Sequence, residues 1–331
     1  MKYLLPQTQF YKASLHTHST VSDGKLTPQQ VKQLYKDAGY SILALTDHHL
    51  IAAHPELNEP DFLTLTAIEL GLDSEDYAPP ASFFGQTYHF NLIAKDPDNL
   101  WQPYPPKADI AVKNPERVAQ ARWDKRPREY SLKCANAMLA RANQEGFLVI
   151  YNHPTWSKQS YPDYAGLKGL WALEIRNTHN CLNGYDDNNH RVYQELLELG
   201  NRLAVVAADD THRPHTVGGS WTMIGAESLT YAGVIDAMEK GHIYASCGPE
   251  IHSLTLEGTT LRVTCSPAAQ VTLQTQARHA QRVAGPLTEA EFDLSVWMTK
   301  SQENPNAFFR LTVTAPDGTY AATRAYFSNE L

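Results

Sequence analysis

Residues 15–24 read Leu-His-Thr-His-Ser-Thr-Val-Ser-Asp-Gly, and this stretch sets the pattern for the first two thirds of the chain. A short apolar strand is expected just before it, at about residues 12–15, so His16 and His18 leave the same strand end. Two imidazoles in that position, with Asp23 nearby, can hold a metal ion. A chain with 14 histidines also produces such pairs by accident, so matching ligands from other segments decide the interpretation.

The same pattern, an apolar strand with a metal-binding residue type at its end, recurs along the chain. Further strands are expected at about residues 41–46, 63–68, 88–94, 147–151, 170–175 and 203–208. Several are continuously apolar, as parallel strands buried on both faces are. Because the carboxyl ends of the strands in a parallel barrel open on one face, we expect the residues at these ends to converge. Those residues are His48, Glu69, His89, which begins its strand, His153, Asp210 and His212.

Helices are expected in most of the connections, which predicts an α/β barrel over residues 1–248. Their ranges are about 27–39, 131–145, 187–199 and 231–240. Periodicity fails at about 96–130, a long insertion that is either a lid or a solvated excursion. Beyond residue 248 short alternating runs, at 261–265, 270–274 and 308–313, predict a small antiparallel, sandwich-like β domain at 249–331.

Composition narrows the class of protein. The 331 residues are 42% hydrophobic and 19% charged, which is typical of a globular chain. No run approaches the ~20 apolar residues of a membrane span and no signal-peptide core is present, which favours a cytoplasmic protein without membrane contact. A net charge of −8 argues against general nucleic-acid binding. The four cysteines form no Cys-x-x-Cys pair, and nothing indicates an oligomeric state.

The ordered motifs resemble those of the PHP (polymerase and histidinol phosphatase) superfamily. They are Leu-His-Thr-His with Ser-Asp-Gly, Leu-Thr-Asp-His, Ala-Ile-Glu, Tyr-His-Phe, Asn-His-Pro and Asp-Thr-His, and they span about residues 12–245. The resemblance implies a distorted seven-stranded (β/α)7 barrel with two or three divalent metal ions. Some members have histidine where this chain has Asp23.

By the same resemblance, one ion would be held by His16, His18, Glu69 and Asp210, and a second by Glu69, His89 and His153. A third would be held by Asp23, His48 and His212, and Glu69 would bridge the first two ions. Residues 248–252 and 310–318 also resemble a two-domain subgroup with a C-terminal β domain, which includes esterases and carbamate hydrolases.

The ligand chemistry suits Zn, Mn or Fe, since imidazoles and carboxylates occur without thiolates. Three such ions would outweigh the charges of Asp23, Glu69 and Asp210 and attract a phosphate. We therefore expect a metal-dependent phosphoesterase that acts on a small phosphorylated molecule, a nucleotide being one candidate, through a metal-bound hydroxide. The alternatives are a carboxyl-ester or carbamate hydrolase using the same site, and a non-catalytic metal- or ligand-binding module.

Roles beyond metal binding are assigned from position along the chain. Glu69 and Asp210 are the expected catalytic carboxylates, and His49 protonates a leaving group or orients its neighbour. Arg176 and Arg213, next to strand ends, are expected to bind phosphate or to form structural salt bridges. Supporting contacts to the ligands are expected from Asp47, Asn152, Glu174 and Asn177. Surface or packing roles are expected for His54, His179, His190, His215, His242, His252 and His279.

Overall fold

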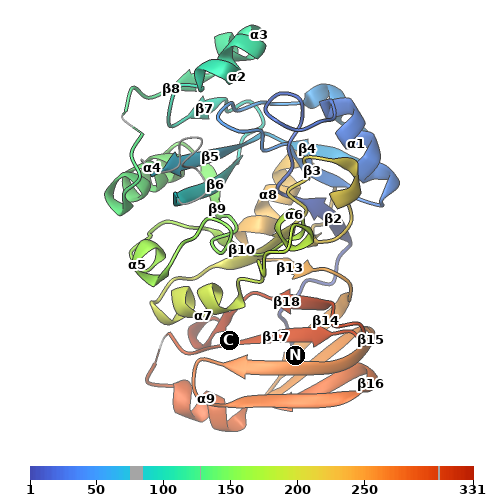
Figure 1. Cartoon of the computed structure of the whole chain (residues 1–331). Helices are drawn as coiled ribbons and strands as arrows, with labels where there is room; N and C mark the ends of the chain where they lie inside the picture. Colours follow the sequence, from blue (N-terminus) through green and yellow to red (C-terminus); the bar gives the residue numbers. More distant parts are fainter. Residues whose placement is uncertain (75–84, 127, 305) are drawn as a thin grey trace.

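The computed structural model describes residues 1–74, 85–126, 128–304 and 306–331, and it has a mixed α/β fold (Figure 1). The predicted insertion at 96–130 therefore includes one residue, Pro127, that lies outside the described residues. Among the described helices, none combines the length and the apolar character needed to cross a membrane.

The first sheet begins with three parallel strands whose carboxyl ends face the site. They are β2 (Phe10–Ser14), β3 (Ile42–Ala44) and β4 (Leu63–Leu65). Helix α1 (Pro28–Asp37) connects the first two strands and begins at a capping box formed by Thr27 and Gln30. It buries Val31 and Tyr35 against the sheet, as its amphipathic spacing predicts. The connection from β3 to β4 contains only the short 3₁₀ helix η1 (Pro55–Leu57).

The second sheet has the strand order β11-β10-β9-β6-β5. Its strands are β5 (Ala67–Asp73), β6 (Thr87–Ala94), β9 (Phe147–Tyr151), β10 (Ala172–Asn177) and β11 (Ala204–Ala208). The connecting helices are α4 (Leu132–Gln144), α5 (Tyr161–Tyr164), α6 (Thr178–Leu182) and α7 (His190–Glu198). Strand β6 is antiparallel to both neighbours, which corrects the all-parallel expectation. An antiparallel strand places its first residues at the edge where parallel strands end, so His89 still reaches the site.

The predicted strand at 63–68 is divided between the two sheets at Thr66. This residue donates a hydrogen bond from Oγ1 to the Pro97 carbonyl (2.7 Å), and its amide donates to the Tyr231 hydroxyl (3.2 Å). Both sheets nevertheless pack on one apolar core that includes Ile42 and Leu65 from the first sheet and Ile150 and Val206 from the second. The chain therefore changes sheets without leaving the core.

Backbone hydrogen bonds join the two sheets at the end that carries the predicted ligands. The His18 amide donates to the Thr211 carbonyl (2.9 Å), and the His49 amide donates to the Glu69 carbonyl (2.9 Å). The α/β class is thus confirmed. The closed seven-stranded barrel stays a prediction, because the described strands that were expected to form it are paired in two separate sheets.

Two strands that the sequence pattern did not indicate extend the first sheet toward the C-terminus. Strands β12 (Trp221–Gly225) and β13 (Ile243–Ser246) flank α8 (Tyr231–Glu239), and β12 pairs antiparallel with β2. Strand β13 then pairs with β18 (Tyr320–Thr323). The sheet runs on through β17 (Phe308–Thr314), β15 (Thr260–Thr275) and β14 (Ile251–Glu257) to the N-terminal strand β1 (Lys2–Tyr3), so it crosses the predicted boundary at 248 without a break (Figure 1).

The C-terminal region is antiparallel, as its alternating pattern predicts. Its strands are β14 (Ile251–Glu257), β15 (Thr260–Thr275), β16 (Ala280–Asp293), β17 (Phe308–Thr314), β18 (Tyr320–Thr323) and β19 (Tyr326–Phe327). One short helix, α9 (Ser295–Ser301), follows β16, and the 3₁₀ helix η5 (Ser328–Glu330) follows β19. A separate apolar cluster that includes Leu254, Val271 and Phe309 fills this region. The division into domains at 248 and 249 remains a prediction.

The predicted insertion covers the site end of the molecule. It contains β7 (Trp101–Gln102), α2 (Ala108–Lys113), α3 (Pro115–Gln120) and β8 (Arg122–Trp123), and Figure 1 shows these elements beside the loops that follow β3. Ile110 packs with Val21 and Leu50, and Asn114 donates a hydrogen bond to the Val21 carbonyl (2.9 Å). The segment is therefore packed against the ligand loops.

Candidate metal centre

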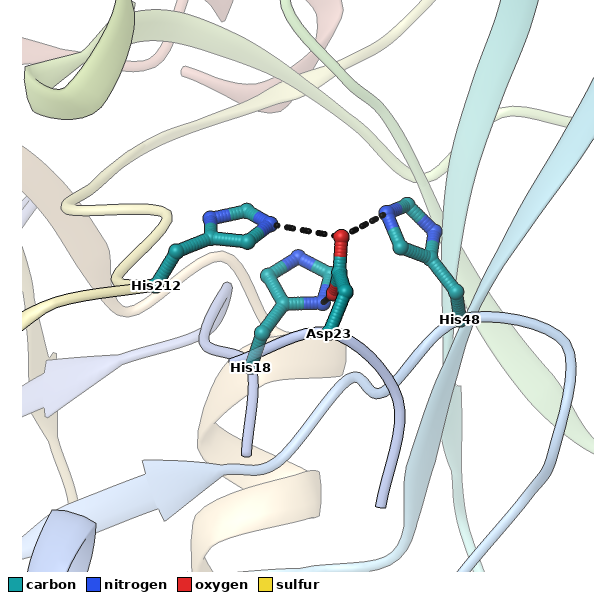
Figure 2. Close-up of side chains that lie close together, drawn as sticks. All are labelled: His18, Asp23, His48 and His212. Carbon is teal, nitrogen blue, oxygen red and sulfur yellow. Dashed lines mark ion pairs between the residues drawn. The ribbon is translucent and has the colours of Figure 1, made fainter. Parts of the chain in front are cut away.

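The nine side chains expected to bind metal lie together. They come from the loops after β2, β3, β9 and β11, and from the first halves of β5 and β6. Figure 2 shows four of them, with Asp23 between His212 and His48 and with His18 behind. Residues separated by up to 196 positions, His16 and His212, are brought to one place by the order of the strands.

Glu69 lies at the centre of the cluster and is 1% exposed. Its Oε1 atom is 3.3 Å from His16 Nε2, and its Oε2 atom is 3.2 Å from His18 Nε2. Three more imidazole nitrogens approach the same carboxylate, and they belong to His48 (3.2 Å), His89 (3.0 Å) and His153 (3.3 Å). A single carboxylate is thus shared among five histidines, which is the arrangement expected of a bridging ligand.

Asp210 and Asp23 extend the cluster on one side. Asp210 Oδ1 lies 3.3 Å from His16 Nε2, 3.1 Å from His18 Nε2 and 3.5 Å from His212 Nδ1. Asp23 is half exposed, and its Oδ2 atom is 3.5 Å from His212 Nε2 and 3.9 Å from His48 Nε2 (Figure 2). Its carboxylate therefore forms the outer edge of the cluster.

Candidate ligand atoms within 4.8 Å of one another form four overlapping groups. They are His16, His18 and Glu69; His16, His153 and Asp210; Glu69, His89 and His153; and His18, Asp23, His48 and His212. Because His16, His18, His153 and Glu69 each belong to two groups, the geometry describes one connected centre with several ligand sets.

Several buried polar atoms in this cluster have no hydrogen-bond partner among the described residues. They are His16 Nε2, both ring nitrogens of His18, His48 Nδ1 and Asp210 Oδ1. Buried polar atoms are normally hydrogen-bonded, so a group of orphans converging on one point fits a bound cation. The donor set of imidazoles and carboxylates suits transition metals such as Zn, Mn or Fe.

The backbone is strained at two of the expected ligands, His153 and Asp210, and at the neighbouring His49. Among the described non-glycine residues, positive φ angles occur at His49 (61°), His153 (26°), Asp210 (53°) and Lys158 (57°). Such conformations cost about 1–3 kcal/mol each and cluster at functional sites. Gly24 is needed for a different reason, because a Cβ there would lie 2.6 Å from the His18 carbonyl oxygen.

Glu174 supports the cluster from β10 with both carboxylate oxygens. His16 Nδ1 donates to Oε1 (2.9 Å), while the His153 amide (3.0 Å) and Asn177 Nδ2 (3.2 Å) donate to Oε2. With Nδ1 donating to Glu174, His16 turns Nε2 toward Glu69 and Asp210, where that nitrogen can ligate a metal ion once its proton is displaced. Asn177 also donates to Asp210 Oδ2 (3.0 Å).

Asp47 and Asn152 act on the ligands in different ways. Asp47 accepts hydrogen bonds from the amides and hydroxyls of Ser19 and Ser22, at 2.7–3.1 Å, and so fixes the loop between His18 and Asp23. Asn152 donates from Nδ2 to Glu69 Oε1 (3.0 Å). Glu174, Asn177, Asp47 and Asn152 thus all lie where supporting contacts were expected.

The electrostatics favour ionised carboxylates at the centre. Burial opposes ionisation of Glu69 and Asp210, but the surrounding imidazoles outweigh it and hold both pKa values well below the ordinary range. Burial likewise lowers the pKa of His18, yet the carboxylates of Asp210 and Glu69 raise it to about 10. A proton and a metal ion therefore compete for His18, so the affinity for metal decreases as the pH is lowered.

A pocket of about 390 Å³ opens at the cluster. Seven of the nine expected ligands line it, as does His49, which was expected to protonate a leaving group or to orient its neighbour. Residues that the sequence pattern did not single out complete the wall, and these are Ser22, Asp73, Lys107, Asp109, Ile110, Trp156, His179 and Asn180. Lys107 Nζ pairs with Asp73 Oδ2 at 3.1 Å. Lys107, Asp109 and Ile110 show that the insertion forms part of the pocket.

The structure places three residues away from one of their expected roles, and a phosphate contact of Arg176 or Arg213 stays a prediction. Neither Arg176 nor Arg213 is among the described residues that line the pocket. The Arg176 guanidinium instead donates to Asn188 Oδ1 (2.8 Å) and Ser220 Oγ (3.2 Å), because a register shift in β10 between Glu174 and Arg176 breaks the strand alternation. Arg213 is exposed before the 3₁₀ helix η4 (Pro214–Thr216). His179, assigned to packing, lines the pocket with its ring 5.0 Å from that of His212.

No family model matches the chain, and no curated protein is significantly similar to it. Among solved structures, it is similar to a two-domain protein from Bacteroides vulgatus containing a predicted PHP-like metal-dependent phosphoesterase. Identity is 16%, with 99% of this chain and 98% of the other covered and a TM-score of 0.45. It is also similar to a lesion-specific endonuclease from Pyrococcus furiosus, with 13% identity and a TM-score of 0.40. That match covers 70% of this chain and 56% of the other. A third similar structure is an amidohydrolase from Chromobacterium violaceum with bound sulfate. Its sequence identity is 19%, the match covers 60% of this chain and 87% of the other, and the TM-score is 0.36. These are distant similarities.

Proposed function

We propose that this protein is a metal-dependent phosphoesterase of the PHP type that hydrolyses a small phosphorylated substrate. The observation behind the proposal is the set of overlapping ligand groups around Glu69, several of whose buried ring nitrogens have no hydrogen-bond partner among the described residues. We further propose two or three Zn, Mn or Fe ions, a distorted seven-stranded barrel and a cytoplasmic location. The hydrogen bonds that join the two sheets at the ligand end support the barrel.

Divalent ions bound to these ligands would lower the pKa of a water molecule and neutralise charge on phosphoryl oxygens. The chain's own residues hold and orient that centre. Glu69 and Asp210 supply buried negative charge, while Glu174 and Asn177 fix the directions of His16 and Asp210. His49 lines the same pocket and can exchange a hydrogen bond with a substrate oxygen.

The charge of the pocket favours an anionic substrate. Five carboxylates line it, from Asp23, Glu69, Asp73, Asp109 and Asp210, together with the ammonium group of Lys107. Three divalent ions would exceed the negative charge and leave the pocket net positive. A phosphoryl transition state spreads its negative charge over several oxygens and gains more from such a pocket than a neutral ester does.

The size of the pocket favours a small substrate. A volume of about 390 Å³ lies at the lower end of the range for pockets that enclose small molecules. Trp156 and Ile110 provide apolar walls beside the polar cluster. This combination suits the organic part of a phosphorylated metabolite or a nucleotide.

The proposal is tested by comparing bond types on protein reconstituted with Mn²⁺, Zn²⁺ or Fe²⁺. Aryl phosphomonoesters and phosphodiesters should be hydrolysed faster than aryl acetates and carbamates, and inorganic phosphate should compete. Lys107→Met should raise KM for phosphoesters about 10-fold, the value of one lost charged hydrogen bond. Arg213→Ala is the matched control, because this exposed cation lies outside the pocket lining. Faster turnover of neutral esters without phosphate competition would replace the proposal with the carboxyl-ester or carbamate alternative.

A further inference from the structure

His49 is held in place by the inserted segment that precedes α4. Its backbone has a φ of 61°, and its side chain is 7% exposed. Gln102, which is fully buried, donates from Nε2 to the His49 carbonyl (3.2 Å) and accepts from the Ile51 amide through Oε1 (2.9 Å). The same amide group donates to the Tyr104 carbonyl (2.6 Å). Gln102 therefore fixes a turn that His49 would not adopt alone.

Arg128, near the end of the insertion, contacts the imidazole itself. Its Nη1 atom lies 3.3 Å from His49 Nδ1, and its Nη2 atom donates to the Pro105 carbonyl (3.3 Å). The guanidinium also lies over the Tyr104 ring, 5.1 Å from its centroid. Two contacts within the insertion, to Pro105 and Tyr104, thus set the position of this guanidinium against His49.

The chemistry of this contact defines the tautomer of His49. A guanidinium has only donors, so His49 Nδ1 must accept the hydrogen bond and the ring proton must stand on Nε2. Since His49 lines the pocket, Nε2–H is the group it can offer to a bound molecule.

We propose that Arg128 is a positioning residue that holds His49 as the Nε2–H tautomer, a hydrogen-bond donor to the substrate. The substrate contact rests on the proposed phosphoesterase function, whereas the tautomer does not. The insertion then has two functions at the site, since it lines the pocket through Lys107 and sets the state of His49 through Arg128. Loss of Arg128 frees His49 to populate both tautomers, and the donor is then present only part of the time.

The test uses ¹⁵N-labelled full-length protein loaded with Zn²⁺, with the ring signals of His49 identified by their loss in His49→Gln. Wild-type protein should show an unprotonated Nδ1 and a protonated Nε2. Arg128→Met should show averaged tautomers and a kcat lowered in proportion to the lost Nε2–H population, about 2-fold for equal tautomers, with the metal content unchanged. Arg128→Lys retains a hydrogen-bond donor, so it should partly restore both the Nε2–H tautomer and kcat. Arg126→Met, which alters an arginine of the same segment paired with Asp124 (3.5 Å), should behave as wild type.

A proton on His49 Nδ1 in the wild-type protein would overturn the inference, even if Arg128→Met fails to fold. An unchanged tautomer together with unchanged kcat in Arg128→Met would also overturn it. Failure of the wild-type protein to hydrolyse any phosphoester would instead refute the proposed function. The ring-nitrogen signals would still decide the role of Arg128.

Discussion

Replacing Glu174 with glutamine tests how the chain prepares its ligands before any ion binds. Glu174 is 1% exposed and uses both oxygens, because His16 Nδ1 donates to Oε1 while the His153 amide and Asn177 donate to Oε2. A glutamine has one acceptor oxygen and one NH₂ group. Whichever way it turns, the NH₂ group faces a donor at a distance of 2.9–3.2 Å. One buried donor then loses its partner, and His16 loses the charge that fixes its tautomer.

Loss of such a supporting contact weakens metal binding about 10- to 100-fold, or about 1.4–2.7 kcal/mol. The assay is a competition titration of the metal-free protein with Zn²⁺ against a chelator of known affinity. Glu174→Gln should bind its tightest ion about 10- to 100-fold more weakly than the wild type does, and its activity should return at saturating metal. Glu239→Gln is a matched control, since Glu239 forms a surface ion pair with Lys95. Equal affinities in the wild type and Glu174→Gln would refute the reasoning about His16.

Two further predictions concern backbone space and pH. Gly24→Ala should reduce the metal content, because the new Cβ would lie 2.6 Å from the His18 carbonyl oxygen and the loop would have to move; unchanged content in elemental analysis would contradict this. Burial, with Arg310 and Arg176 nearby, lowers the pKa of His190 to about 4, so the unfolded chain binds this proton first as the pH falls below about 6.5. The free energy of unfolding, measured with urea, should therefore fall as the pH is lowered from about 6.5 toward about 4. His190 should account for up to about 3 kcal/mol of this loss, so the loss should be smaller by that amount in His190→Gln. An identical pH dependence in the two proteins would count against the buried, neutral His190.

The fold and the ligands were predictable where the information is local. Residues such as His48, Glu69 and His153 directly adjoin apolar strands, so the strand pattern alone placed them at one edge. The direction of β6 was not predictable, because His89 occupies the same edge whether it begins an antiparallel strand or ends a parallel one. Strands β12 and β13 are short, and pairing rather than pattern defines them.

The substrate side of the pocket was less predictable, because it depends on contacts between distant segments. Arg176 follows Glu174 by two residues and would share its face in a regular strand, but the register shift separates them. Lys107 and Arg128 lie in a segment without periodicity, whose only signal was its positive charge and length. Their importance follows from the packing of that segment on Val21 and His49, which no local pattern encodes.

The central claim is a single centre with several ions, joined by Glu69. It is tested most directly by elemental analysis of the wild-type protein and Glu69→Gln after reconstitution and removal of free metal. Two to three equivalents should bind to the wild type, and Glu69→Gln should lose more than one equivalent, because Glu69 belongs to two ligand groups. Less than one equivalent in the wild type, or the same stoichiometry in both proteins, would contradict the account.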